Sequence, residues 1–223
     1  MVAGLPEPVR RWLTHAIAPG TPLRETAELS MRGEIRLGAW RPFRATQVLA
    51  PPRGFIWAAT TRVAGLPVTG YDRYSRGTGE MRWRLLRAVP VMSATGADIT
   101  RSAAGRLAGE LPLVPAAALR PEVSWHPVDA ARATASVRVG DEECRVTLTV
   151  SPSGAPESVT VPRWGNPDKA GYREHTFGGV FTDQAFFDGF TIPCGGRFGW
   201  WYGSSRWPKG EFFHMTIDHA AYH

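Results

Sequence analysis

The chain has 223 residues, of which 43% are hydrophobic and 21% charged, and it contains only two Cys, fifty positions apart. A chain of this length can bury roughly 70% of its unfolded surface, and two distant Cys exclude a disulfide framework and an ordinary zinc module. No apolar run approaches the ~20 residues that span a bilayer, and residues 1–11 contain no apolar signal core. We therefore expect a soluble, cytoplasmic protein without stable membrane insertion.

The net charge of +6 is unevenly distributed along the chain. Residues 1–120 contain 17 Arg and 8 acidic residues, a net charge of +9, whereas residues 121–223 contain 9 basic and 12 acidic residues, a net charge of −3. Such asymmetry can indicate a face for nucleic acid or a membrane surface. However, 24 of the 26 basic residues are Arg, as in proteins of GC-rich genomes, and the Arg of 73–87 alternate with apolar residues. We expect no nucleic-acid partner.

The chain begins with a predicted amphipathic helix over 5–16. Its apolar residues are three and four positions apart, and its prolines lie in the first turn, where a missing N–H costs nothing. Residues 27–37 then alternate between apolar and polar side chains, which predicts one long half-buried strand or two strands joined at Gly33.

The same alternation returns at 55–63 and at 81–85. The glycine-containing turn at 76–79 is typical of a hairpin and pairs the strand at 72–74 with the strand at 81–85. A helical interruption follows at 98–119, where Pro112 and Pro115 break the helix.

The second half is again predicted as strands separated by turns, over 123–125, 135–139, 144–150, 159–161, 172–181, 186–192, 198–202 and 213–217. The expected fold class is mainly β (α+β), an antiparallel curved sheet or barrel of about ten to twelve strands. We find no repeat and no linker, so we expect a single domain over 1–223.

The chain is rich in aromatic residues, with nine Trp, ten Phe and five Tyr. Some of them fill a core, but aromatics on several strands also suggest a concave face too wide for side chains to fill, hence a pocket for an apolar ligand. Arg106 could bind a carboxylate of such a ligand in bidentate geometry. The predicted ligand-binding residues are Trp57, Met81, Trp83, Arg106, Trp125 and Trp200.

Three residues are candidates for acid–base catalysis. Glu110 lies at the C-terminal end of the predicted helix, where the helix dipole disfavours a negative charge, so its carboxyl group could serve as a general acid or base. The alternative is an ion pair with Arg106, four residues earlier on the same face of the helix. Asp72 and Tyr74 alternate onto one strand face and could protonate or orient a carbonyl. Their alternative is a structural role beside the hairpin turn.

Several signals of other chemistries are missing from the sequence. It contains no Gly-x-Ser-x-Gly elbow, no phosphate loop and no paired His or Cys spacing for a metal. The lone His175 is expected to be a satisfied polar residue rather than a catalyst. We expect no cofactor and no metal.

A set of motifs in the first 130 residues carries a resemblance. They are Leu5-Pro6-x-Pro8-Val9, Gly33-Glu34-Ile35-Arg36, Trp40-Arg41-Pro42-Phe43, Asp72-Arg73-Tyr74-x-x-Gly77-x-Gly79 and Gly105-Arg106-Leu107-x-x-Glu110-Leu111. In this order the set resembles an uncharacterised bacterial family of unknown function, with a predicted shape similar to the LolA-like half-barrel of periplasmic lipoprotein carriers. The resemblance implies a strongly curved half-barrel whose concave face, partly plugged by a central helix, holds lipid.

Two hypotheses follow for the function. In the first, the protein binds an apolar small molecule and acts on it without a cofactor, by cyclisation or isomerisation, because holding a substrate in a reactive conformer lowers the barrier. In the second, it is a non-catalytic carrier of a lipid or acyl chain. The first is favoured because proteins resembling this family often carry an N-terminal membrane segment, which we do not expect here. A homodimer would cover the exposed edges of an open sheet.

Overall fold

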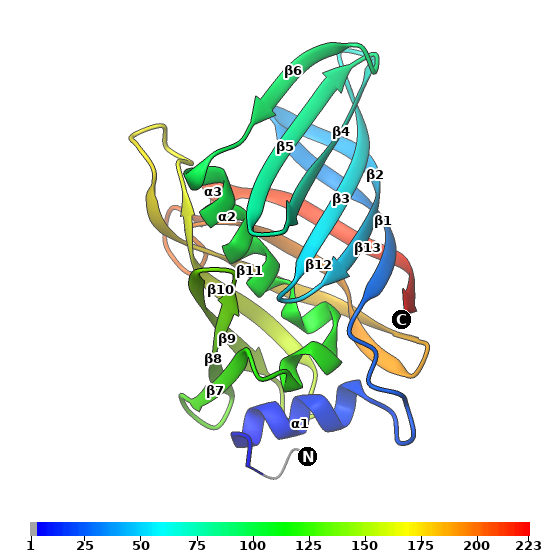
Figure 1. The fold of residues 1–223 in the computed structure, drawn as a ribbon, viewed down its shortest axis with the longest axis vertical. Coiled ribbons are helices and arrows are strands. Elements are labelled where there is room, and N and C mark those ends of the chain that lie inside the picture. Colours follow the sequence, from blue (N-terminus) through cyan, green and yellow to red (C-terminus); the bar gives the residue numbers. More distant parts are fainter. Residues whose placement is uncertain (1–3) are drawn as a thin grey trace.

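The computed structural model describes residues 4–223, and its thirteen strands form a single antiparallel sheet that curls into a half-barrel (Figure 1). The predicted fold class is confirmed, with slightly more strands than the ten to twelve expected. The strands are β1 Ala27–Leu37, β2 Ala39–Ala50, β3 Gly54–Val63, β4 Leu66–Ser75, β5 Thr78–Leu85, β6 Val89–Ala94, β7 Val123–Pro127, β8 Arg132–Val139, β9 Glu142–Val150, β10 Pro156–Gly165, β11 Arg173–Phe187, β12 Phe190–Trp200 and β13 Glu211–Tyr222.

The sheet consists of two arms, each a meander of hairpins. The first arm is β1–β6 and the second arm is β7–β13, and the two are joined through the pairing of β1 with β13 in the middle of the sheet. The outer edges of the sheet are therefore β6 and β7. Because each arm curls toward the same side, the sheet has a concave inner face, on which the central helix lies (Figure 1).

The helices are α1 Glu7–Ala16, α2 Ala97–Gly109 and the short α3 Trp207–Gly210, with two 3-10 turns, η1 Leu111–Leu113 and η2 Pro115–Leu119. The predicted helical interruption at 98–119 is therefore one helix and two short turns. Pro112 and Pro115 each lie at the start of a 3-10 turn, since proline cannot continue the hydrogen bonding of α2.

Helix α2 connects the two arms across the inner face. It contacts β4 and β5 of the first arm and β8, β9 and β10 of the second. Two glycines allow the close approach to β10, because a Cβ at Gly105 would lie 3.2 Å from Cγ of Arg163, and one at Gly109 would lie 3.1 Å from Cγ2 of Val161. The helix thus serves as the predicted central plug.

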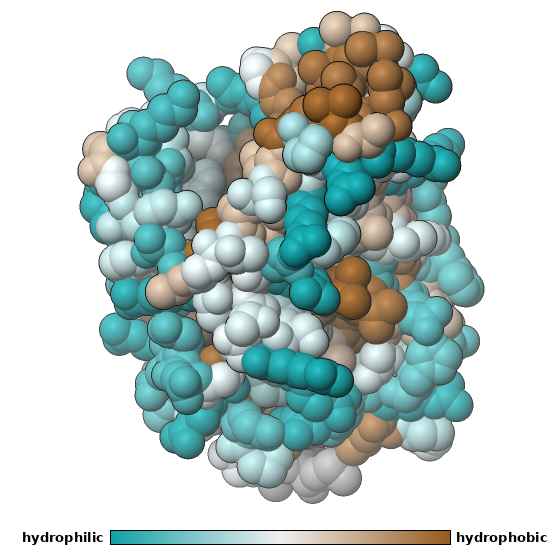
Figure 2. All heavy atoms as spheres, turned by 45° about the horizontal axis from the view of Figure 1, so that its top comes forward, coloured by the Kyte–Doolittle hydropathy of each residue, from teal (hydrophilic) through white to brown (hydrophobic). Residues whose placement is uncertain are grey.

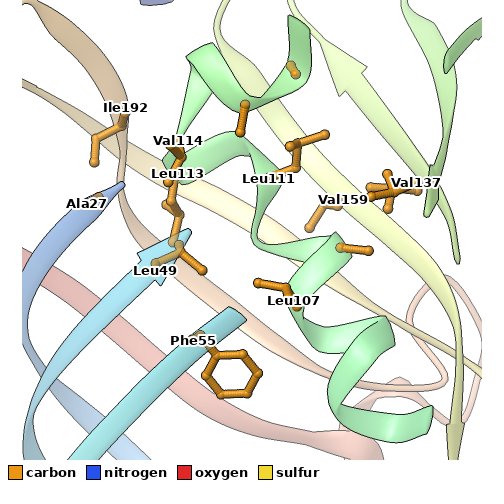
Figure 3. Packing of buried hydrophobic residues seen from close by; sticks show 14 of the residues in the cluster. Ala27, Leu49, Phe55, Leu107, Leu111, Leu113, Val114, Val137, Val159 and Ile192 are labelled. Atoms are coloured by element: carbon orange, nitrogen blue, oxygen red, sulfur yellow. The ribbon is translucent and has the colours of Figure 1, made fainter. Parts of the chain in front are cut away.

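The core lies where α2 and η1 meet both arms (Figure 3). Leu107 and Leu111 are fully buried between Leu49 on one side and Val137 and Val159 on the other. Burying a leucine side chain contributes about 2 kcal/mol relative to leaving it exposed. This shared core holds the two arms at a fixed separation.

The observed strands differ from the predicted ones at three places, β2, β6 and residues 186–192. Strand β2 was not predicted, because Arg41 and Pro42 interrupt the apolar alternation at its start, and β6 was not predicted because nearly all of it is exposed. Residues 186–192 form a hairpin turn rather than one strand, since Asp188 and Gly189 both have positive φ. Of the two alternatives for residues 27–37, one long strand is confirmed, because β1 runs through Gly33 without a break.

Among residues 4–223, no helix is both long and apolar enough to cross a membrane. The prediction that residues 1–11 lack a signal core falls partly on residues 1–3, which lie outside the described residues.

Candidate ligand site on the inner face

A row of inward-facing residues crosses the first arm in register. Gln47 on β2 pairs with Trp57 on β3, Trp57 pairs with Asp72 on β4, and Asp72 pairs with Met81 on β5. Residues in register on neighbouring antiparallel strands place their side chains on the same face of the sheet. The alternation that predicted an inward-facing Asp72 therefore places it beside two of the predicted ligand-binding residues.

The next row along the sheet contains small residues that leave room for a tryptophan. Ala45, Ala59 and Gly70 occupy this row on β2, β3 and β4. The ring of Trp83 lies over Gly70, where a Cβ would come within 2.5 Å of the ring. From there the indole N–H of Trp83 donates to Oδ1 of Asp72 at 3.0 Å.

Arg106 of α2 faces this row and joins two carboxylates. Its Nη1 lies 3.1 Å from Oδ2 of Asp72, and its Nε donates to Oε1 of Glu110 at 2.8 Å. The amide of Gln47 donates to the remaining oxygen of Glu110. All four carboxylate oxygens of the two acids therefore accept a hydrogen bond.

The guanidinium of Arg106 also lies over aromatic rings, 4.5 Å from the centroid of Phe55 and 5.2 Å from that of Trp57. Burial raises the pKa of Asp72, against the opposing effects of Arg106 and the Trp83 hydrogen bond. Burial lowers the pKa of Arg106, but the two carboxylates together raise it above its ordinary value. The charges of Arg106, Asp72 and Glu110 therefore influence one another.

Arg163 of β10 lies on the other side of α2 and has a different environment. Its Nε donates to the backbone carbonyl of Ser102 at 3.0 Å, and its guanidinium lies 4.7 Å from the ring centroid of Phe177 and 5.2 Å from that of Trp200. Among residues 4–223, no acidic side chain forms an ion pair with it. Burial and then repulsion by Arg106 lower its pKa to about 10, so the two acids at a distance do not compensate for its burial.

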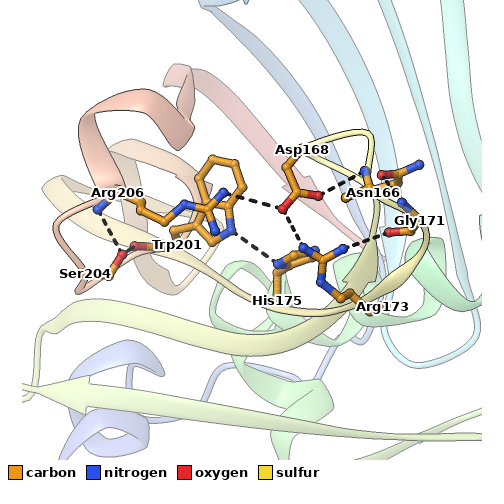
Figure 4. A network of polar contacts seen from close by, with 9 residues as sticks. Asn166, Asp168, Gly171, Arg173, His175, Trp201, Ser204 and Arg206 are labelled. Atoms are coloured by element: carbon orange, nitrogen blue, oxygen red, sulfur yellow. Dashed lines mark hydrogen bonds and ion pairs between the residues drawn. The ribbon is translucent and has the colours of Figure 1, made fainter.

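A polar network surrounds His175, which pairs in register with Arg163 (Figure 4). Asp168, in the loop between β10 and β11, accepts from Arg173 and lies 3.5 Å from Nη2 of Arg206 in the loop after β12. Arg206 stacks 3.8 Å above the ring of Trp201. These contacts join two loops that are far apart in the sequence.

The indole N–H of Trp201 donates to Nδ1 of His175 at 3.2 Å, so the proton of the neutral imidazole is on Nε2. Within the described part of the chain, this buried Nε2 has no hydrogen-bond partner. Burial, followed by the charge of Arg173, lowers the pKa of His175, which therefore stays neutral near neutral pH. His175 was expected to be a satisfied polar residue, and the structure leaves one of its nitrogens unsatisfied.

The predicted site residues do not all lie together. Trp57, Met81, Trp83 and Arg106 surround Asp72 and Glu110, and Trp200 lies with Arg163. The hydroxyl of Tyr74 instead lies 3.4 Å from the carbonyl of Val139 on the second arm. Tyr74 lines a small hollow at this junction with Pro52, Arg53, Gly77, Glu122, Arg138 and Gly140.

Trp125 is separate from both arginines. Its indole N–H donates to the carbonyl of Ala118 at 3.1 Å, and its ring meets the edge of Trp12 from α1 at 5.9 Å between centroids. This is the core-filling role that we weighed for any single tryptophan. Among residues 4–223 there is no group of three or more potential metal ligands.

Sequence reasoning missed Gln47, Phe177 and Arg163. The signal for Arg163 was available, because Val159, Val161 and Arg163 follow the period of two that turns the valines inward. An arginine in the phase of buried valines indicates an inward-facing charge, as Asp72 in the phase of Trp83 does.

A family model and several solved structures are similar to this chain. The model of a family of unknown function, DUF6544, matches residues 1–212. The chain belongs to this family. The prediction of membership in an uncharacterised family is thereby confirmed, and no curated protein matches the chain in sequence.

Among solved structures, the DUF6544 chain is similar to a LolA superfamily protein from Nitrosomonas europaea, with a TM-score of 0.49 and 10% identity over 97% of this chain and 92% of that one. It is also similar to a DUF1329 family protein from Desulfovibrio piger, with a TM-score of 0.44 and 12% identity over 97% of this chain and 94% of that one. At these identities, the similarities assign neither a ligand nor an activity to this DUF6544 protein.

Proposed function

We propose that this DUF6544 protein binds an amphipathic molecule on the inner face of its sheet, with an anionic group at Arg163 and an apolar body against the aromatic side chains. The single observation that carries the proposal is the environment of Arg163. A half-buried guanidinium without a carboxylate partner is unfavourable, and a carboxylate or phosphate from a ligand would supply the missing charge.

The surroundings of Arg163 support an apolar body for the ligand. Phe177 and Trp200, whose rings lie beside its guanidinium, are both on the inner face and only partly buried, so part of each aromatic surface faces solvent. Ligand sites of this kind combine a mainly apolar wall with a few polar groups that fix orientation. Arg106 is less suited to the ligand than the sequence suggested, because its N–H groups already bind Asp72 and Glu110.

The test compares two ligands that differ only in their end group, oleate and oleyl alcohol. We expect the wild type to bind oleate more tightly, and Arg163→Gln to lose that preference by roughly tenfold or more, as for a charge-assisted hydrogen bond. Arg145→Gln is the matched control, because Arg145 is exposed on the neighbouring β9. The proposal is wrong if Arg163→Gln binds oleate as the wild type does, or if the wild type binds neither compound.

Turnover of the bound molecule by cyclisation or isomerisation is the second candidate function. The observation that favours it is Asp72, a partly exposed inner carboxyl whose pKa is raised by burial. Against it, every oxygen of Asp72 and Glu110 already accepts a hydrogen bond, so a proton transfer would first have to break one.

This second candidate is tested by incubating purified protein with an organic extract of its host and following the compounds by mass spectrometry. A compound consumed by the wild type but not by Glu110→Gln, with a product of equal mass, would support turnover. A compound that copurifies unchanged with both the wild type and Glu110→Gln would mean that the protein binds the compound without turnover. Cytoplasmic location and a homodimer stay predictions.

A further inference from the structure

Exposed apolar side chains gather at one end of the first arm, far from Arg163 in the sequence. The turns that join β3 to β4 and β5 to β6 lie at the same end of the sheet, because alternate turns of an antiparallel meander share an end. We define the tip as residues 62–68 and 84–92. Five of its large apolar side chains are 44–55% exposed, namely Leu66, Leu86, Val89, Val91 and Met92. Figure 2 shows an apolar patch at this end of the molecule.

The tip includes an edge of the sheet. Strand β6 pairs only with β5, and five of its six residues are exposed. Exposed apolar edges favour unwanted pairing, so proteins usually shorten, charge or cover them, and an apolar patch of this kind commonly marks an interaction site. The opposite edge strand, β7, is covered, because it contacts α1 and η2.

The turn at the tip has an unusual sequence for its backbone. Leu86 and Arg87 both have positive φ, and the N–H of Ala88 donates to the carbonyl of Leu85. Turns with two consecutive positive φ values favour Asn or Asp followed by Gly. Three other hairpins of this chain have glycine at the second position, in the pairs Ala64-Gly65, Arg76-Gly77 and Asp188-Gly189.

The β5–β6 turn thus holds a large apolar and a cationic side chain in a backbone conformation that neither favours. A residue held in an unfavourable backbone conformation lowers the stability of the folded state, and such residues are concentrated at functional positions. Leu86 and Arg87 are both exposed, and the β5–β6 turn that contains them lies at one end of the molecule (Figure 1).

Charge identifies the occupant of the patch. Residues 60–70 and 81–97 contain no Asp or Glu, and the exposed Arg62, Arg84 and Arg87 form no ion pair with any acid of residues 4–223. Two copies of the chain meeting at this edge would bring like charges together, which is unfavourable. Apolar side chains surrounded by arginines are instead complementary to an anionic lipid surface.

We propose that the tip docks this protein onto the surface of an anionic phospholipid bilayer, with Leu86 and its apolar neighbours entering the interface and Arg62, Arg84 and Arg87 binding lipid phosphates. The patch continues onto the inner face, because Met92 pairs in register with Trp83. Docking would therefore bring the open edge of the half-barrel against the lipid. This inference does not depend on the ligand proposed at Arg163.

The experiment is flotation of the full chain with vesicles of phosphatidylcholine alone or mixed with phosphatidylglycerol. We expect flotation with the mixed vesicles only, reduced by salt. The decisive variant is Leu86→Asn with Arg87→Gly, which gives the turn its favoured residues. It should unfold at the same or a higher temperature than the wild type and bind vesicles roughly tenfold or more weakly, since each arginine at such a surface contributes ~1 kcal/mol and leucine burial adds to this.

The matched control is Val48→Ser with Ile56→Ser. These two side chains are each 46% exposed and are paired on the outer face of β2 and β3, away from the tip. Arg84→Gln with Arg62→Gln tests the charges alone and should weaken binding roughly thirtyfold. The proposal is overturned if the wild type floats with neither vesicle, if the control loses as much binding as the tip variant, or if light scattering finds a wild-type dimer that the tip variant abolishes.

Discussion

Arg106 and Arg163 both extend onto the inner face and both lie over aromatic rings, but within residues 4–223 only Arg106 has carboxylate partners. The first arm supplies one of these acids, Asp72, and α2 supplies Glu110. The second arm supplies no acid to Arg163, only Phe177 and Trp200. Arginine is therefore paired with acids on one side of α2, whereas on the other side it contacts only aromatic rings and a backbone carbonyl.

The largest expected effect comes from removing the paired arginine. Arg106→Met would leave Asp72 and Glu110 partly buried without their cation, which should lower the free energy of unfolding by about 3 kcal/mol. Arg163→Met removes a charge that has no partner, so it should change stability by less than about 1 kcal/mol. Urea denaturation of both variants at neutral pH measures the difference. Equal losses would mean that the two arginines are structurally equivalent.

The pH dependence of stability sharpens the comparison. The folded-state pKa of Asp72 is raised above its ordinary value of 3.8, mainly by burial. The stability that it contributes is therefore fully present below that value and is lost as the pH rises through the folded-state pKa. Asp72→Asn should remove this loss, so its stability relative to the wild type should increase with pH across this window. A relative stability that falls over the same range would show that the ion pair with Arg106 outweighs burial.

The smallest effect is expected at Tyr74, the third catalytic candidate. Tyr74→Phe removes a long hydrogen bond to Val139 and should cost about 1 kcal/mol or less. It should leave oleate binding unchanged, because Tyr74 faces the junction of the two arms rather than either arginine. A tenfold loss of oleate affinity in this variant would place the ligand at that junction instead.

The sequence was sufficient for local features of this site. Period-two alternation placed Asp72 and Trp83 on the inner face, and the four-residue spacing on a helix predicted the Arg106–Glu110 pair. These predictions succeed because they depend on side-chain direction within one strand or helix.

The sequence was insufficient where distant segments meet. Gln47 and Glu110 are joined only because α2 lies across the first arm, and Arg163 packs against α2 where Gly105 leaves room for its side chain. Trp125 has the same local pattern as Trp83 but packs against α1. Strand β6 has no buried face, so alternation could not reveal it.

The pairing of β1 with β13 has a consequence for how the chain is made. Ala27 lies opposite Tyr222, and backbone hydrogen bonds join Thr26 to His223. On a ribosome, the hairpins of each arm can form as soon as they emerge, but the middle of the sheet stays open until β13 has been synthesised. During that time β1 exposes an unpaired edge, and closing it brings together residues almost the whole chain apart, a slow kind of contact. The nascent protein is therefore most exposed to aggregation at what becomes the centre of its sheet.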